Sequence, residues 1–155
     1  MRKLGLLGLA LALLFVGPTP AGTEHRVDYE KPKVGLLVTY PASWRPIGHP
    51  LTRCTNPVER IDLAGPGGAL FMLQESLGRN ASAGMPARPR NFEVRGAPSP
   101  LECCRATRQP GWLLPFKEGG RGFYAYLYPG RLDVRAELVA ILNSLRVRPT
   151  GAPIS

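Results

Sequence analysis

Residues 122–128 read GFYAYLY, residues 129–130 are Pro-Gly, and residues 131–146 read RLDVRAELVAILNSLR. The first run alternates two sets of side chains: Phe123, Ala125 and Leu127 against Tyr124, Tyr126 and Tyr128. A period of two is typical of a strand whose faces meet different surroundings. The last run spaces its apolar residues by three and four: Val134, Leu138, Ile141, Leu142 and Leu145. This spacing predicts one amphipathic helix over 131–146. The three runs together predict an α+β domain in which a C-terminal helix packs on an antiparallel sheet.

Two pairs of apolar runs predict hairpins before this helix. Residues 112–116 and 122–128 flank KEGGR at 117–121, and residues 61–64 and 69–74 flank Gly-Pro-Gly-Gly at 65–68. Glycine-rich breaks between β-rich runs are typical of hairpin turns. The 65–68 turn lacks the Lys-Ser/Thr and the following helix of a phosphate-binding loop. Residues 34–39 and 91–95 suggest further strands, and residues 77–91 suggest a long surface loop.

The N-terminus has the layout of a secretory signal peptide. Arg2 and Lys3 precede thirteen apolar residues at 4–16, and small residues at 19 and 21 mark a cleavage site before Gly22. A membrane-spanning helix needs about 20 residues, so contact with the membrane through an uncleaved signal is the alternative. We expect a secreted or extracytoplasmic protein with a signal peptide at 1–21, a flexible tail at 22–32, one α+β domain at 33–149 and a C-terminal tail at 150–155.

The chain is basic, with 20 Lys and Arg against 11 Asp and Glu and a formal net charge of +9. Sixteen of the basic residues are arginine, but they are scattered, and no run resembles a nucleic-acid-binding arm. Export also argues against a nucleic-acid partner. Two explanations of the arginine excess remain. One is a GC-rich genome that encodes Arg in place of Lys, and the other is attraction of the protein to an anionic envelope polymer or lipid surface.

Three cysteines, Cys54, Cys103 and Cys104, make a disulfide the expected outcome in an exported domain. Adjacent Cα atoms lie about 3.8 Å apart, closer than the usual span of about 4.4–6.8 Å across a disulfide. Cys54 should therefore pair with Cys103 or Cys104 and leave one thiol over. A redox or partner-linking thiol is one alternative. A zinc site that adds His49 is another, although the Cys-x-x-Cys spacing of such sites is absent.

Two short motifs resemble a known family. Residues 38–44 read VTYPASW, and residues 138–147 read LVAILNSLRV, an apolar helix ending in Leu-Asn-Ser-Leu-Arg-Val. Together they resemble the two ends of the PsbP-like α/β/α sandwich, the fold of the photosystem II extrinsic subunit and of many exported bacterial proteins. The strand start GRGF at 120–123 is similar to short exported proteins of actinobacterial type without assigned activity. The resemblance implies a sheet flanked by helices over residues 34–148 and a binding or assembly module without catalytic residues, although this chain shows one clear helix.

The tyrosines of residues 122–128 offer a candidate binding surface. Trp112, on the neighbouring arm of the hairpin, is expected to join Tyr124, Tyr126 and Tyr128 in one aromatic face. The simplest interpretation is a sheet face packed under the C-terminal helix. The alternative is a platform for a glycan or peptide, with nearby arginines supplying polar contacts. Trp44 is expected to be a buried core anchor.

The sequence shows no recognisable catalytic motif. His49 lies between Gly and Pro, and neither Ser43 nor Ser76 sits in a Gly-x-Ser-x-Gly elbow. An acid pair such as Asp62 and Glu75 would have to converge in a cleft. We expect no cofactor, no metal and no enzyme activity.

The leading interpretation is an exported domain that binds or helps assemble another cell-envelope component, either a protein or an anionic polymer. One alternative is an extracytoplasmic carrier of a small ligand or glycan, with the tyrosine face as its binding surface and residues 77–91 as a lid. The other is a small extracytoplasmic hydrolase.

Overall fold

The computed structural model describes residues 26–31, 35–48, 59–76, 83–101 and 109–148. Its strands are β1 (Arg26–Lys31), β2 (Leu36–Pro41), β3 (Arg45–Pro46), β4 (Arg60–Ala64), β5 (Leu70–Glu75), β6 (Ser99–Leu101), β7 (Gln109–Glu118), β8 (Arg121–Tyr128) and β9 (Arg146–Val147). Its helices are the short 3-10 turns η1 (Pro66–Gly68) and η2 (Leu132–Val134) and the α-helix α1 (Arg135–Ser144). The predicted signal peptide and the three cysteines lie outside the described residues.

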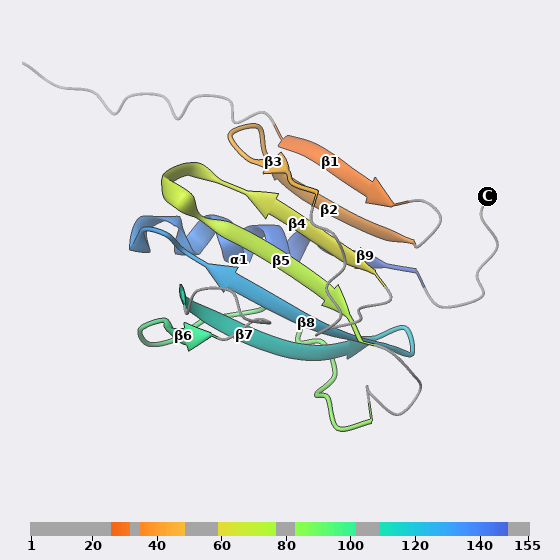
Figure 1. Ribbon diagram of the computed structural model, residues 1–155. Coiled ribbons are helices and arrows are strands. Elements are labelled where there is room, and N and C mark those ends of the chain that lie inside the picture. The colour runs from red at the N-terminus through yellow and green to blue at the C-terminus, as the bar shows by residue number, and fades with distance from the viewer. Residues whose placement is uncertain (1–25, 32–34, 49–58, 77–82, 102–108, 149–155) are drawn as a thin grey trace, which may run out of the picture.

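The strands form two antiparallel sheets, and α1 lies against both (Figure 1). The larger sheet has the strand order β3-β4-β5-β8-β7-β6, and the smaller has the order β1-β2-β9. In Figure 1 the helix runs behind the larger sheet. The four strands of the two predicted hairpins are adjacent in this sheet, as β4-β5 and β7-β8. The structure therefore confirms the α+β class and the helix packed on an antiparallel sheet.

One face of the larger sheet, called here the inner face, packs against α1 and forms the core. The register places Leu127 between Phe71 and Trp112, and Phe123 beside Phe116. Side chains that alternate along these strands share one face, so the predicted apolar set of β8 is confirmed as the core-facing set. The inner-face members of the core are Ile61, Leu63, Phe71, Leu73, Trp112, Phe116, Phe123, Ala125 and Leu127.

The C-terminal helix is shorter than its apolar pattern predicts. The pattern covers residues 131–146, but a 3-10 turn precedes α1, and the backbone becomes extended at Leu145, with φ −53° and ψ 130°. The chain then pairs with β2 as β9. The apolar stripe itself is confirmed, because Leu138, Ile141 and Leu142 are completely buried. No helix in the described part of the chain is long and apolar enough to cross a membrane.

Asn143 and Ser144, the last two residues of α1, form hydrogen bonds with two segments beside the helix, at Phe92 and at Thr39 of β2. The Asn143 side chain accepts from the Phe92 N–H at 2.7 Å and donates to the Phe92 carbonyl at 3.4 Å. The Ser144 hydroxyl accepts from the Thr39 N–H at 2.9 Å, and its oxygen also lies 2.9 Å from the Thr39 carbonyl. Both side chains thus replace backbone partners that a strand would supply. This gives the Leu-Asn-Ser-Leu motif a structural role.

Residues 83–98, called here the strap, cross from β7 to the C-terminal end of α1. Lys117 N–H donates to the Pro86 carbonyl, and Arg88 N–H donates to the Lys117 carbonyl. The Arg88 guanidinium donates to the Leu145 and Asn143 carbonyls at 2.7 and 3.1 Å and pairs with Glu118. A cation at these terminal carbonyls satisfies groups that have no partner within the helix.

Two sequence expectations about local structure are wrong. Residues 26–31, expected within a flexible tail, form β1 and pair with β2 along their whole length. Val27 and Tyr29 alternate with charged residues, but two apolar residues among four charged ones are a weak strand signal. The described part of the expected 77–91 surface loop, residues 83–91, is irregular and mostly exposed, although Met85 is buried and backbone hydrogen bonds hold the segment against β7. Residues 91–95, expected as a strand, are not one, since Asn143 binds both backbone polar groups of Phe92 in place of a strand.

Candidate functional site

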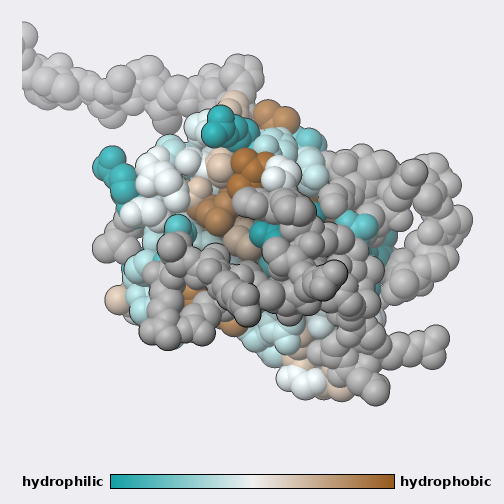
Figure 2. Space-filling view, in the orientation of Figure 1, coloured by the Kyte–Doolittle hydropathy of each residue, from teal (hydrophilic) through white to brown (hydrophobic). Residues whose placement is uncertain are grey.

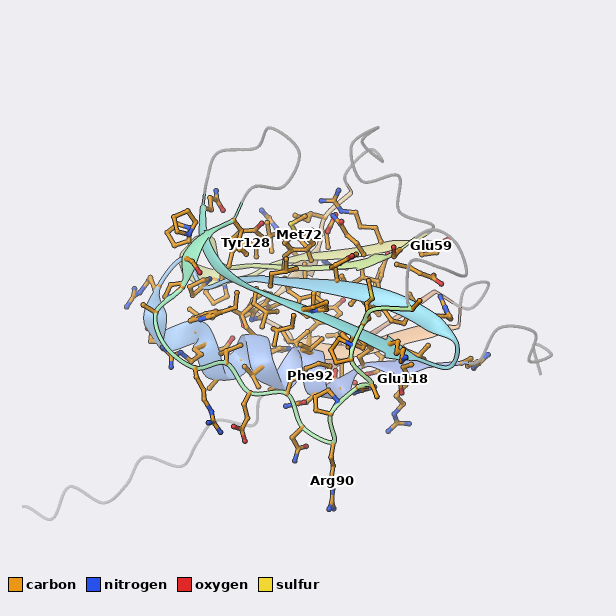
Figure 3. The ribbon with its side chains drawn as sticks, turned by 90° about the horizontal axis from the view of Figure 1, so that it is seen from below. Glu59, Met72, Arg90, Phe92, Glu118 and Tyr128 are labelled. Carbon is orange, nitrogen blue, oxygen red and sulfur yellow. The ribbon has the colours of Figure 1, made fainter. Side chains whose placement is uncertain are left out.

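The face of the larger sheet opposite α1, called here the outer face, combines aromatic and polar side chains. One row across β4, β5, β8 and β7 consists of Asp62, Met72, Tyr126 and Leu113. The neighbouring row consists of Arg60, Gln74, Tyr124 and Pro115. Figure 3 shows Met72 and Tyr128 on this side of the sheet, away from α1 and Phe92. Figure 2 looks onto the same side and shows hydrophobic and hydrophilic residues interspersed.

Exposure rises across the outer face from β4 to β7. Asp62, Met72 and Gln74 are only 6%, 5% and 3% exposed, Tyr126 is half-buried, and Leu113 is 42% exposed. Leu113 pairs with Tyr126 across β7 and β8, so the two partly or fully exposed side chains are neighbours. The β7–β8 half is therefore the accessible part of this face.

The β4–β5 half carries a buried charge pair. Arg60 forms an ion pair with Asp62, and their side chains are 9% and 3% exposed. The Arg60 guanidinium also contacts the Met72 sulfur at 3.9 Å. A buried ion pair adds little net stability compared with apolar residues of the same size. Stability alone therefore does not account for these residues.

The tyrosines line up along β8. The rings of Tyr126 and Tyr128 are nearly parallel, with an interplanar angle of 7° and centroids 6.4 Å apart. Tyr124 lies on the same face one pleat further along the strand. The three residues form one column of aromatic side chains on the outer face, called here the tyrosine column.

The expected aromatic face is corrected in two ways. The helix covers the inner face, so the tyrosine column does not lie under it. Trp112 pairs with Leu127 and belongs to the core, with only 8% of its surface exposed. Its indole ring lies under the Arg135 guanidinium, 5.1 Å from the ring centroid. Trp112 is therefore separated from the tyrosines by the thickness of the sheet.

Arg60 and Gln74 of the outer face escaped the sequence analysis, which considered Asp62 only as part of an acid pair. Arg60, Asp62 and Gln74 alternate with Ile61, Leu63 and Leu73, so the signal was present in the period of two. The hairpin at 65–68 pairs β4 with β5, and the tyrosines join these residues only through the long-range pairing of β5 with β8. The polar residues and the tyrosines become neighbours only through the register of the paired strands.

The candidate acid pair does not converge. Asp62 pairs with Met72 on the outer face, whereas Glu75 is on the inner face, where Arg121 donates two hydrogen bonds to it at 2.7 and 2.6 Å. Both side chains of the Glu75–Arg121 pair are nearly buried. Glu75 is thus held as a structural counter-charge and does not share a cleft with Asp62.

The remaining candidate residues divide between the described and undescribed parts of the chain. Ser43 is exposed on the β2–β3 turn, and Ser76 follows β5. His49, Cys54, Cys103 and Cys104 lie outside the described residues. Within the described residues no group of three His, Cys, Asp or Glu side chains is placed to hold a metal ion.

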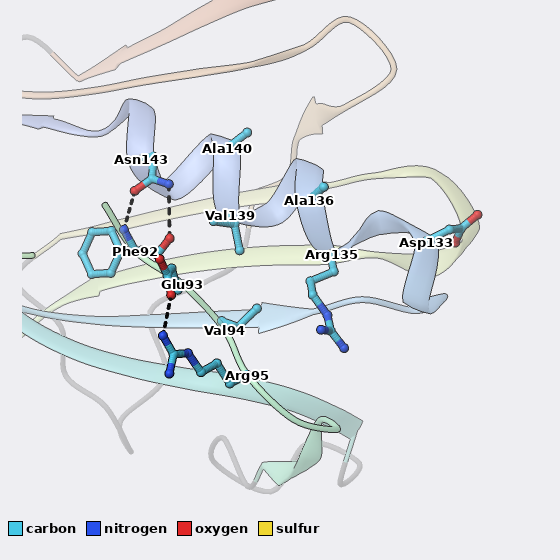
Figure 4. A pocket seen from close by; sticks show the side chains of 10 residues that line it. All are labelled: Phe92, Glu93, Val94, Arg95, Asp133, Arg135, Ala136, Val139, Ala140 and Asn143. Carbon is cyan, nitrogen blue, oxygen red and sulfur yellow. Dashed lines mark hydrogen bonds and ion pairs between the residues drawn. The ribbon is translucent and has the colours of Figure 1, made fainter. Parts of the chain in front are cut away.

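A shallow groove of about 740 Å³ lies on the other side of the molecule, between α1 and the strap (Figure 4). Val94, Val139 and Ala140 contribute its apolar surface, and Arg95 at its rim is paired with Glu93 at 3.0 Å. The Asn143 side chain closes one end through its two bonds to Phe92. The charged groups of opposite sign here favour no one kind of ligand.

Comparison of the chain with models of protein families, with curated proteins and with solved structures finds no match.

Proposed function

We propose that this chain is an exported, non-enzymatic domain, built as a PsbP-like sandwich, that binds or helps assemble another component of the cell envelope. The observation that carries the proposal is the outer face. It combines a column of tyrosines, a buried Arg60–Asp62 pair and the exposed Leu113 on the side that α1 leaves uncovered. Aromatic residues with arginine are typical of binding surfaces.

Export and charge support the same proposal. The signal-like N-terminus directs the chain out of the cytoplasm, where envelope proteins and polymers are the available partners. Without residues 1–21, which contain Arg2 and Lys3, the chain keeps 18 Lys and Arg against 11 Asp and Glu, and the resulting formal net charge of +7 attracts an anionic envelope polymer at long range. The tyrosine column then supplies the short-range contacts that a charge alone does not provide.

The two rival functions receive less support. A hydrolase built on Asp62 and Glu75 would need both carboxylates in one cleft, and they lie on opposite faces of the sheet. A carrier with residues 77–91 as its lid would need that segment free to move. Residues 86–88 instead exchange hydrogen bonds with Lys117 of β7.

The test is photo-crosslinking in cells of the source organism with the tagged full-length chain. A photoreactive amino acid replaces Leu113 on the outer face, and a matched control replaces Arg95, whose side chain is 89% exposed on the strap. We expect position 113, and not position 95, to give a recurrent adduct with one envelope component. Equal labelling from both positions, or none from position 113, would contradict the proposal.

Export has its own measurement on the same samples. The intact mass of the purified chain should correspond to a protein that begins at Gly22. A full-length mass recovered from the cytoplasm would remove the compartment on which the choice of partner rests.

A further inference from the structure

A pocket, called here the end pocket, lies at one end of the larger sheet and includes Tyr128 of the outer face. Its volume is about 450 Å³. The wall comes from the turn after β4, the turn after β8, the segment before β6 and the first residues of β7, and Tyr128 is the aromatic member. In Figure 1 these turns meet at the left-hand end of the sheet. The volume falls within the range of about 300–1,000 Å³ that is typical of small-ligand sites.

The wall of this end pocket is preformed. Gly67, Gly68 and Gly130 have positive φ angles of 63°, 79° and 59°. A Cβ atom at Gly130 would overlap the Gly67 carbonyl and the Gly68 backbone, so the two turns are packed directly against each other. Proline occupies positions 98, 110 and 129 of the wall and fixes the backbone there. A ligand would find the pocket already shaped, which lowers the cost of binding.

The chemistry of the wall selects an uncharged ligand. No Lys, Arg, Asp, Glu or His is among its described lining residues, and its polar side chains are the Gln109 amide and the Tyr128 phenol. An ion moved into such a site would lose water without gaining a counter-charge. The Gln109 amide offers both donors and an acceptor. A Cβ atom built at Gly68 would have nothing within 4 Å, so a ligand can approach the backbone of this glycine closely.

Together these features match a sugar ring. A pyranose presents an apolar C–H face, which the prolines of the wall and the small exposed part of Tyr128, 5% of its surface, can contact. It also presents a rim of hydroxyl groups that both donate and accept hydrogen bonds. The amide of Gln109 and the backbone of the glycine turns suit that rim. The described part of the wall carries no charged side chain, which suits a sugar without carboxylate or phosphate groups.

Tyr128 belongs to both the pocket wall and the tyrosine column. Tyr128 lines the pocket and stacks on Tyr126, and Tyr124 follows on the same face of β8. A chain of sugars that starts in the pocket would therefore run along the column. We propose that the end pocket takes the uncharged terminal sugar of an envelope glycan, whose next residues lie along Tyr126 and Tyr124. This inference rests on the proposed function and names the class of envelope component.

The test uses purified mature chain labelled with ¹⁵N. Neutral monosaccharides and oligosaccharides and their carboxylated or phosphorylated counterparts are titrated, and amide shifts are followed by NMR. We expect a neutral oligosaccharide to move the Gly67, Gly68 and Gly130 amides and to bind more tightly than its terminal monosaccharide. Counterparts that carry the carboxylate or phosphate on the terminal sugar itself should bind more weakly. No shift at millimolar sugar, or shifts confined to the groove between α1 and the strap, would overturn the inference.

Two variants on one strand make the test specific. Gln109→Ala removes the amide from the pocket and should weaken binding about tenfold, the effect of one lost polar contact. Lys117→Ala shortens an exposed side chain at the other end of the same strand, outside the pocket wall, and should leave the affinity for a monosaccharide unchanged. Equal affinity of the Gln109→Ala variant and the parent chain would contradict the site. Persistent crosslinking from position 113 in that case would leave the proposed function standing and remove only the sugar pocket.

Discussion

Trp44 provides the sharpest test of how this fold is held together. It follows β2 in a turn closed by its own N–H to the Pro41 carbonyl at 2.9 Å, and it is only 3% exposed. The indole ring covers Gly65, where a Cβ atom would lie 2.5 Å from Trp44 Cε2. The indole Nε1 donates to Glu137 Oε2 of α1 at 2.7 Å. One side chain therefore joins the β2–β3 turn, the turn after β4 and the helix.

The expected cost of changing Trp44 has two parts. Trp44→Ala should lower the free energy of unfolding by about 3–5 kcal/mol, the usual range for a buried aromatic residue. Trp44→Phe removes only the five-membered ring and the indole N–H. The smaller ring should account for about 1 kcal/mol. The hydrogen bond to the half-buried carboxylate should account for about 1–2 kcal/mol more.

Trp112 supplies a matched control. It also belongs to the core, and its indole Nε1 has no hydrogen-bond partner in the described structure. Trp112→Phe therefore removes the same atoms without breaking a hydrogen bond. We expect Trp44→Phe to cost about 1–2 kcal/mol more than Trp112→Phe.

The measurement is urea denaturation followed by far-UV circular dichroism, because either substitution alters tryptophan fluorescence. The double variant Trp44→Phe/Glu137→Ala should show coupling between the two positions, since each change removes one partner of the same hydrogen bond. Equal costs for Trp44→Phe and Trp112→Phe, with no coupling to Glu137, would refute the argument that this hydrogen bond fastens the helix.

Three further predictions concern other parts of the fold. Glu75→Gln should lower the free energy of unfolding, measured by urea denaturation, by about 3 kcal/mol, because it removes the carboxylate partner of the buried Arg121. A decrease of less than about 1 kcal/mol would show that other groups hold the guanidinium. Gly130→Ala should lower the free energy of unfolding by about 2 kcal/mol or more, because residue 130 has a positive φ and its new Cβ atom would overlap the neighbouring turn. Gly48→Ala should be nearly neutral, because a Cβ atom there would have nothing within 4 Å. Similar melting temperatures for the two variants would count against the packing of the two turns. Burial raises the pKa of Tyr40, so the folded state favours the protonated phenol. The stability that this preference contributes is complete below the ordinary tyrosine pKa of about 10 and is lost as the pH rises above it. In urea denaturation at alkaline pH, the free energy of unfolding of Tyr40→Phe should therefore decline less steeply with pH than that of the parent chain.

The main hairpin shows how far sequence reasoning reaches in this chain. The period of β8 correctly divides its residues between two faces. Trp112 was assigned to the wrong face because the connection was treated as a five-residue break. The structure turns on Gly119 and Gly120 alone, with φ angles of 58° and 78°, so that Glu118 pairs with Arg121. A two-residue Gly-Gly turn of this kind fixes the register and would have placed Trp112 opposite Leu127.

Other contacts were beyond the reach of local pattern. Asn143 meets Phe92, 51 residues away, and Ser144 meets Thr39, 105 residues away. A helix period identifies which positions are buried, but it does not say which distant backbone groups a polar residue will bind. For the same reason the strap could not be predicted from its Gly and Pro content. Its hydrogen bonds to β7 and α1 exist only once the sheet has formed.

The two faces of the larger sheet suggest where selection for function has acted. The inner face is mostly apolar, and its described carboxylates, Glu75 and Glu118, are paired with Arg121 and Arg88. The outer face buries Arg60 and Asp62 where apolar residues would give equal or greater stability. Local choices that do not favour stability are expected at functional sites. Replacing Arg60 and Asp62 together with apolar residues should therefore leave the stability nearly unchanged and weaken binding to the envelope component, a separation that a purely structural role for the pair would not produce.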